Sequence, residues 1–141
     1  MRVFRTVVYT VLILAILVTL IVKQRQRMAL LHGGRSPAAA ALLEATKAHI
    51  PAWLFVQSPV CQTCQQMEKV YKKLEPGFAG KVEFVKVDIN SPVEQDLVRR
   101  FNVRLVPTSV FIGSDGKVVA KKIGAMPLGE TKTILIGLRK H

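Results

Sequence analysis

Cysteine is scarce in this sequence of 141 residues, which contains only Cys61 and Cys64. Two cysteines are too few to staple a small secreted domain and too few to close a tetrahedral zinc site within one chain. Histidine does not complete such a site, because His32, His49 and His141 lie far apart, and none directly follows Cys64, as haem attachment would require. The two cysteines are therefore either a redox pair or two inert thiols.

Acidic residues are also few, with nine Asp and Glu against 21 Lys and Arg, so the formal net charge is +12. Aromatic residues make up only 6% of the chain, and none is interleaved with a basic stripe. Because the sequence also lacks a nucleic-acid-binding motif, we expect no nucleic-acid partner. Lys23, Arg25 and Arg27 follow an apolar segment and are instead suited to contact anionic lipid headgroups.

One long hydrophobic run is present at the start of the chain. Val3 to Val22 reads VFRTVVYTVLILAILVTLIV and contains a single charged residue, Arg5. At about 1.5 Å per residue, a helix of this length spans roughly 30 Å, which matches the hydrocarbon thickness of a bilayer. Every face of this helix is apolar, and the rest of the chain is too small to bury it. The run therefore predicts a transmembrane helix.

A cleavable signal peptide is the alternative for this run. Such a peptide has an apolar region of roughly 7–15 residues and a small-x-small cleavage site, whereas this run is longer and ends in Lys23–Arg27. We therefore expect a retained anchor over residues 1–27, a linker over 28–37 and one domain over 38–141. Positive residues flank both ends of the run, so the charge count favours a cytoplasmic domain only slightly and leaves the topology open.

The remaining chain alternates between helical and strand patterns. Ser36 is suited to cap a helix that has Pro37 at its first position. The expected helices cover residues 38–49, 61–74, 92–101 and 127–140, and the expected strands cover residues 52–57, 82–88, 108–112 and 117–123. Pro76 and Gly77 are expected to interrupt the chain, and Gly113–Gly116 is a hairpin signal. This order predicts an α/β domain with a mixed sheet and helices on both faces.

Cys61 and Cys64 lie where the first expected strand gives way to a helix. At a helix N-terminus, unpaired N–H groups and the helix dipole favour the thiolate of Cys61 and lower its pKa below about 8.5. Cys64 lies one turn further along, where we expect it to be more buried and able to attack a mixed disulfide formed at Cys61. This spacing also allows a disulfide between the two residues. The CxxC motif alone does not separate a redox pair from two core cysteines.

The segments around this motif resemble the thioredoxin family. They read AWLFVQSPVCQTC, EFVKVDIN, FNVRLVPTSVFI and SDGKVVAKKIGA, in the family's order, within residues 51–139. The resemblance implies a thioredoxin-like three-layer fold and a cis Val106–Pro107 peptide bond against the two sulfurs. It further implies that Val106 offers free backbone groups to an extended substrate, that Thr108 continues the strand, and that Gly124 forms the other rim of a groove.

Several positions depart from the family pattern. Phe55 stands where thioredoxins typically carry a buried acid that helps to move the proton of the second cysteine. Lys86 matches the usual partner of that acid, so we expect it to face solvent or to serve another carboxylate. Val60 replaces a tryptophan, Lys69 replaces a helix-kinking proline, and Gln62-Thr63 replaces Gly-Pro, where Thr63 either donates toward a thiolate or lies on the helix surface. The redox potential and direction therefore stay open.

The resemblance implies a thiol–disulfide oxidoreductase that uses Cys61 as nucleophile and Cys64 as resolving cysteine, without a metal or organic cofactor, and the apolar run at the start of the chain adds a membrane tether. Its expected partners are protein disulfides or dithiols, an electron-donating redox protein and, through the N-terminal helix, membrane lipid. Family habit favours an extracytoplasmic domain. The alternatives are an adaptor or subunit of a membrane complex, motivated by Phe55, and a redox sensor whose disulfide alters partner binding without turnover.

Overall fold

The structure is a computed structural model that describes residues 13–20 and 36–138. Residues 13–20 are helical, and the large apolar side chains of this helix are between 49% and 61% exposed. No helix within these two ranges is long and apolar enough to span a membrane. Most of the predicted helix Val3 to Val22, and the predicted linker up to residue 35, lie outside the described residues. The compact unit of residues 35–141 is considered on its own below.

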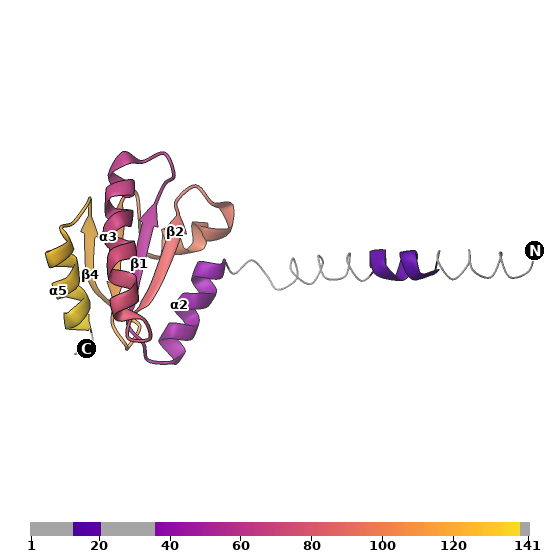
Figure 1. The fold of residues 1–141 in the computed structure, drawn as a ribbon, viewed down its shortest axis with the longest axis horizontal. Coiled ribbons are helices and arrows are strands. Elements are labelled where there is room, and N and C mark those ends of the chain that lie inside the picture. Colours follow the sequence, from indigo (N-terminus) through magenta and orange to yellow (C-terminus); the bar gives the residue numbers. More distant parts are fainter. Residues whose placement is uncertain (1–12, 21–35, 139–141) are drawn as a thin grey trace, which may run out of the picture. The chain divides into compact units, whose positions relative to one another are not determined.

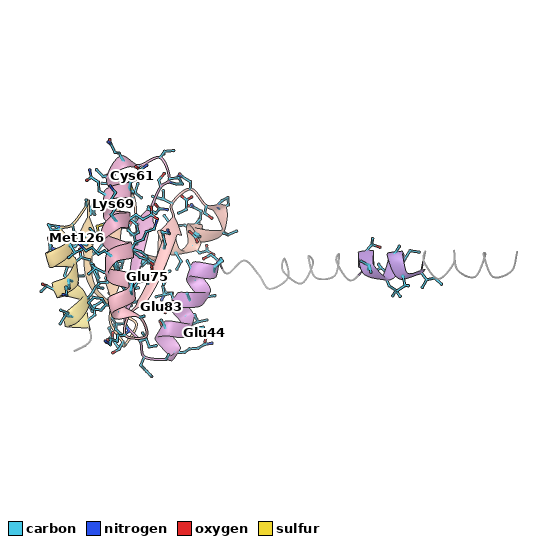
Figure 2. All side chains as sticks on the ribbon, viewed as in Figure 1. Glu44, Cys61, Lys69, Glu75, Glu83 and Met126 are labelled. Atoms are coloured by element: carbon cyan, nitrogen blue, oxygen red, sulfur yellow. A yellow bond between two sulfur atoms is a disulfide. The ribbon has the colours of Figure 1, made fainter. Side chains whose placement is uncertain are left out.

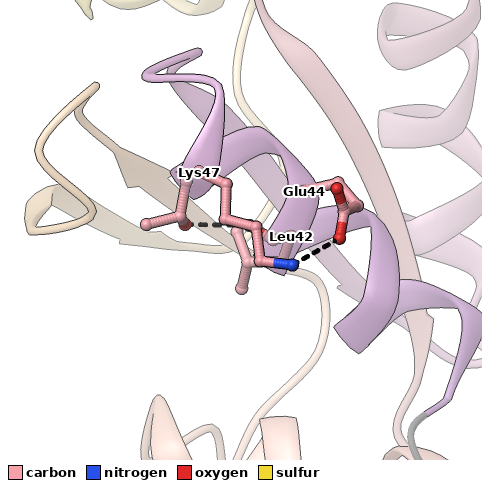
Figure 3. A network of polar contacts seen from close by, with 4 residues as sticks. Leu42, Glu44 and Lys47 are labelled. Carbon is pink, nitrogen blue, oxygen red and sulfur yellow. Dashed lines mark hydrogen bonds and ion pairs between the residues drawn. The ribbon is translucent and has the colours of Figure 1, made fainter.

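This unit opens with helix α2 (Pro37–Lys47), whose start agrees with the prediction. The Ser36 hydroxyl accepts a hydrogen bond from the backbone N–H of Ala39 at 3.0 Å, and Pro37 occupies the first helical position. The helix ends two residues before the predicted His49, because His49 takes a positive φ of 54° and turns the chain toward the first strand. Figure 3 shows the last turn, where the Thr46 hydroxyl donates to the carbonyl of Leu42 and Lys47 pairs with Glu44.

Four strands form one sheet in the order β2-β1-β3-β4. They are β1 (Ala52–Gln57), β2 (Glu83–Asp88), β3 (Thr108–Ile112) and β4 (Val118–Ile123). The β1–β2 pair is parallel, whereas β1–β3 and β3–β4 are antiparallel, so the predicted mixed sheet is confirmed. The predicted hairpin between β3 and β4 is also confirmed: the Gly113 N–H donates to the carbonyl of Lys117 at 2.8 Å, and Gly116 has a φ of +77°.

Helices cover both faces of the sheet, which confirms the three-layer architecture (Figure 1). Strand β1 supplies side chains to both apolar cores. Leu54 and Val56 pack with Leu42 of α2 and with the helical segment after β2, while Trp53 and Phe55 pack with residues of α3 (Gln62–Phe78) and α5 (Leu128–Leu138). Burial on both faces makes β1 the central strand, and its carboxyl end leads directly to the two cysteines.

Besides the earlier end of α2, two further helices differ from the prediction. Helix α3 continues to Phe78 instead of ending near Leu74, with Pro76 inside its last turn. The apolar core explains this extension, because Phe78 is buried in the cluster that contains Trp53, and the last turn brings it there. The helix predicted from Pro92 to Phe101 is divided into a 3-10 turn, η1 (Pro92–Glu94), and a short α-helix, α4 (Gln95–Arg100).

Candidate active site

Cys61 is the N-cap residue of α3, as the sequence predicted for a cysteine at the start of a helix. The chain leaves β1, turns through Ser58 and enters the helix, with the Cys61 N–H donating to the carbonyl of Ser58 at 3.1 Å. The Cys61 sulfur accepts a hydrogen bond from the backbone N–H of Cys64 at 3.1 Å. The Thr63 hydroxyl lies 3.3 Å from the same sulfur, so Thr63 contacts the site from the exposed side of the helix. These two donors are positioned to stabilise negative charge on the Cys61 sulfur.

Cys61 and Cys64 form a disulfide with their Cα atoms 5.2 Å apart. The two residues differ in access: Cys61 is partly exposed, whereas Cys64 is fully buried. Figure 2 shows Cys61 at the opposite end of α3 from Glu75. A protein substrate can therefore reach the first sulfur and not the second.

The Val106–Pro107 peptide bond is cis, as the resemblance implied. The carbonyl oxygen of Val106 lies 3.9 Å from the Cys61 sulfur, so the predicted juxtaposition of this peptide and the disulfide is confirmed. The β1–β3 and β3–β4 ladders begin only at Thr108, which leaves the backbone of Val106 outside both. Gly124 lies beside the Val106–Pro107 segment, because its N–H donates to the carbonyl of Pro107 at 2.8 Å. Its φ is +95°, a conformation that favours glycine.

Thr108 lies beneath this segment and not on its surface. Its side chain is 1% exposed, and its hydroxyl donates to the carbonyl of Leu105 at 2.6 Å. This bond holds the turn that presents Val106. Thr108 thus supports the candidate groove from within, while its role toward a substrate stays a prediction.

Phe55 is fully buried in the aromatic cluster, 5.7 Å from Tyr71 between ring centroids. Lys86 is its register partner on β2 and pairs with Glu68 of α3 at 2.9 Å, which agrees with the second of the two expected alternatives, that it serves another carboxylate. The hydrogen bond from Lys86 and then that from Lys72 hold the pKa of Glu68 below its ordinary value. The ion pair between Glu68 and Lys86 therefore joins α3 to β2. Strand β1, where thioredoxins typically carry the buried acid, has no carboxylate in this chain.

Two features of the site were not anticipated from the sequence. Asn90 donates from its side chain to the hydroxyl of Ser58 at 3.0 Å and so ties the turn before Cys61 to the loop after β2. Exposed apolar side chains also flank the site: Val60, Leu105 and Ile123 are 91%, 61% and 62% exposed and directly precede Cys61, Val106 and Gly124. Their apolar character is visible in the sequence, but their common location depends on the fold.

Comparison with known proteins identifies similar sequences and folds. Residues 38–136 match the family model of the thioredoxin-like domain. Thioredoxin of Haemophilus influenzae is 38% identical over 78 residues, which are 55% of this chain and 70% of that protein. Thioredoxin C-2 of Corynebacterium nephridii is 37% identical over 67 residues, or 48% of this chain and 59% of that protein.

Two further matches are more distant. A thiol:disulfide interchange protein TxlA homolog of Synechocystis is 26% identical over 81 residues, covering 57% of this chain and 45% of that protein. The crystal structure of oxidised thioredoxin O2 from Arabidopsis thaliana has a TM-score of 0.61 at 24% identity, covering 71% of this chain and 84% of that one. This structural likeness supports the fold.

Proposed function

The chain belongs to the thioredoxin family of protein-disulfide oxidoreductases, and we propose that its Cys61–Cys64 pair exchanges disulfides with protein substrates while the chain is tethered to a membrane. The observation that carries this proposal is the asymmetry of the disulfide. Cys61 is partly exposed at the first turn of α3, with two hydrogen-bond donors around its sulfur, whereas Cys64 is buried. Such an arrangement gives the two sulfurs different chemical roles.

In the reducing direction, the thiolate of Cys61 attacks one sulfur of a substrate disulfide. A mixed disulfide forms, and the other substrate sulfur leaves as a thiolate. Cys64 then attacks the Cys61 sulfur, which releases the second substrate thiol and leaves Cys61 and Cys64 oxidised. The two electrons gained by the substrate come from the two cysteines, so this exchange requires no metal or organic cofactor. An electron-donating redox partner must afterwards reduce the pair.

We assign the substrate-binding surface to the backbone segment beside the sulfurs. Its backbone contacts are the free peptide groups of Val106, with Pro107 and Gly124 shaping the rim and Thr108 supporting them from below. An extended substrate segment adds to this edge by backbone hydrogen bonds. Val60, Leu105 and Ile123 supply exposed apolar contacts around it.

We further propose that the apolar N-terminal segment tethers the domain to a membrane, with the domain on the extracytoplasmic side. The support is the continuous apolar run from Val3 to Val22 and the exposed apolar side chains of the helix over residues 13–20. Labelling of Cys61 in intact cells with a membrane-impermeant maleimide, after reduction, tests the side. Labelling only after lysis would contradict the extracytoplasmic assignment.

The test of the enzymatic proposal is disulfide reduction by the full-length chain in detergent micelles. We expect the wild type to reduce insulin disulfides with a thiol donor, the Cys61→Ser variant to be inactive, and the Cys64→Ser variant to accumulate mixed disulfides. Equal reduction rates for wild type and Cys61→Ser would contradict the proposal.

A second candidate function is an adaptor or subunit of a membrane complex, which the buried Phe55 favours because it removes the acid that assists the second cysteine. Purification from native membranes separates the two. An adaptor retains a stable, noncovalent partner that is unaffected by Cys64→Ala, whereas an oxidoreductase traps partners covalently through Cys61 when Cys64 is replaced.

A further inference from the structure

A buried hydroxyl without a hydrogen-bond partner lies on the sheet face that α3 covers. Ser109 of β3 is 1% exposed, and among the described residues its Oγ is one of two buried side-chain polar atoms without a hydrogen-bond partner. The other buried serine and threonine hydroxyls of the described residues each have one: Ser36, Ser58, Thr108 and Thr131. An unpaired buried hydroxyl destabilises a fold, so its presence calls for a reason.

The strand register places Ser109 on the face that α3 covers. Ser109 pairs with Phe55 across β1 and β3, and Phe55 belongs to the core cluster formed with Met67 and Tyr71 of α3. Pro107, which precedes β3 and lies two residues before Ser109, follows the carbonyl that lies 3.9 Å from the Cys61 sulfur. The hydroxyl therefore lies on the same side of the sheet as the disulfide.

Cys64 heads the buried face of α3. The buried residues of α3 are Cys64, Met67, Tyr71, Leu74 and Phe78, which repeat at helical spacing and cover this side of the sheet. Cys64 is thus the member of this face nearest the helix N-terminus. Its sulfur is removed from water and needs a protein donor, or a trapped water, if it is to carry charge.

We propose that the Ser109 hydroxyl donates a hydrogen bond to the Cys64 thiolate once the disulfide is reduced, directly or through one trapped water, and so prepares the sulfur that releases substrate. This inference rests on the proposed function. In the disulfide form the Cys64 sulfur is neutral and a weak acceptor, which accounts for a hydroxyl without a partner. In the dithiol form the thiolate is a strong acceptor, and the same hydroxyl gains a hydrogen-bond partner.

The chemical step that depends on this contact is the second one. The Cys64 thiol gives up its proton, and the thiolate attacks Cys61 in the mixed disulfide. The Cys61–Cys64 bond forms, the bond from Cys61 to substrate breaks, and the leaving thiolate takes up a proton to become a thiol. Ser109 keeps its own proton throughout, so it is a positioning residue and not the base.

Charged groups on the surrounding elements are already paired with one another. Glu68 lies one turn beyond Cys64 on α3 and pairs with Lys86 of β2 and Lys72 of its own helix. Lys122 of β4 is the register partner of Ser109 and pairs with Glu130 of α5 at 3.4 Å. The described part of β1 and β3 contributes no ionisable side chain on this face. Phe55 has two polar register partners, Ser109 of β3 and Lys86 of β2, and Lys86 is already paired with Glu68.

The first measurement is the ionisation of Cys64 as the single thiol of the full-length Cys61→Ala chain in detergent, followed by ultraviolet absorbance of the thiolate. We expect Ser109→Ala to raise the pKa of Cys64 by about one unit, a tenfold loss of thiolate at a fixed pH below that pKa. Ser109→Thr retains the hydroxyl and should keep the pKa of Cys64 at the value found with Ser109. Thr131→Val, which removes a buried hydroxyl that bonds to Pro127, is the matched control and should leave Cys64 unchanged.

The second measurement is the rate of substrate release in the two-cysteine chain. A symmetrical chromogenic aromatic disulfide liberates one coloured thiolate when Cys61 attacks and another when Cys64 resolves. We expect Ser109→Ala to leave the first phase unchanged, to slow the second about tenfold at neutral pH, and to move its pH profile up by about one unit. The free energy of unfolding of the oxidised protein should not fall, because an unpaired hydroxyl has been removed.

Three outcomes would overturn the inference. They are an unchanged Cys64 ionisation in Ser109→Ala, a slowing that is equal at every pH, and a shift produced by Glu68→Gln in place of Ser109→Ala. A wild type that shows neither phase would instead contradict the proposed oxidoreductase function, while the single-thiol titration would still decide the role of Ser109.

Discussion

At the residue scale, the reactivity of Cys61 depends on which groups surround its sulfur. The backbone N–H of Cys64 and the hydroxyl of Thr63 lie at 3.1 and 3.3 Å, and both are consequences of Cys61 occupying the N-cap position of α3. The backbone donor is available to any residue at this position. The hydroxyl comes from Thr63, one of the two residues between the cysteines, so a substitution of Thr63 removes this donor.

We predict that Thr63→Ala slows alkylation of Cys61 in the reduced protein about threefold at a pH below the thiol's pKa. The reason is the loss of a hydrogen bond to a charged sulfur, whose strength is reduced here by exposure to solvent. The rate of reaction with iodoacetamide as a function of pH measures it. Thr133→Ala is the control, since Thr133 is an exposed helical threonine of α5 whose hydroxyl bonds to Gly129. An alkylation profile identical to that of the wild type would remove Thr63 from the site.

Gly124 is the second residue whose identity the site requires. A Cβ there meets nothing within 4 Å, but the φ of +95° strains any other residue. We predict that Gly124→Ala lowers the free energy of unfolding by about 1–2 kcal/mol and weakens protein-substrate binding. Gly137→Ala is the control, because Gly137 is helical and equally unobstructed, and alanine there should be neutral or stabilising by about 0.5 kcal/mol. Chemical denaturation and the KM for insulin test both, and an equal effect of the two substitutions would contradict the argument.

At the element scale, α3 is joined to β2 by the pairing of Glu68 with Lys86. The lowered pKa of Glu68 means that the folded protein binds its proton less readily than the unfolded chain. This pairing therefore adds stability above the ordinary carboxyl pKa of 4.5, and that contribution is lost as the pH falls through the lower, folded-state value. The partial exposure of both side chains limits its size.

We predict that Glu68→Gln lowers the free energy of unfolding by less than about 1 kcal/mol at neutral pH, and that the difference from the wild type disappears in acid. Urea denaturation across a pH series measures it. A double-mutant cycle with Lys86→Gln isolates the pair, and a difference that persists unchanged in acid would show that the effect is not electrostatic.

The sequence predicts elements better than contacts. The strand bounds of β1 and β3 agree with the prediction because Pro51, Cys61 and the β-hairpin glycines limit them locally. The end of α3 does not, since the burial of Phe78 decides it and Pro76 is tolerated in the last turn. The partner of Lys86 lies 18 residues away on another element, and no local pattern identifies it.

The candidate site shows the same division. The Cys61–Cys64 pair is a motif that is contiguous in the sequence, and the cis Val106–Pro107 bond is implied by the family resemblance of the segment around it. The unpaired hydroxyl of Ser109 and the link between Asn90 and Ser58 follow from neither, because they depend on strand register and on a loop from a different crossover. The contacts of such polar residues can therefore be identified only from the folded sheet and not from their sequence neighbours.

At the scale of the whole molecule, the proposed tether determines where the redox pair works. We predict that Ile16→Arg weakens membrane retention of the full-length chain during an alkaline wash, since a central arginine disfavours insertion by about 2.5–3.5 kcal/mol. Fractionation followed by immunoblotting measures it. Val93→Arg is the control, because Val93 is a similarly exposed apolar residue of the thioredoxin-like domain. Equal loss of both variants, or of neither, would contradict an anchor role for residues 13–20.

The packing of the core also provides an optical probe. Trp53 is the chain's single tryptophan, is fully buried, and lies 5.7 Å from Phe111 and 5.1 Å from Tyr71 between ring centroids. Because it belongs to the central strand, its surroundings become aqueous only when the sheet comes apart. The intrinsic fluorescence of the unlabelled protein should therefore shift to longer wavelength upon cooperative unfolding, which gives a direct signal for the denaturation experiments above.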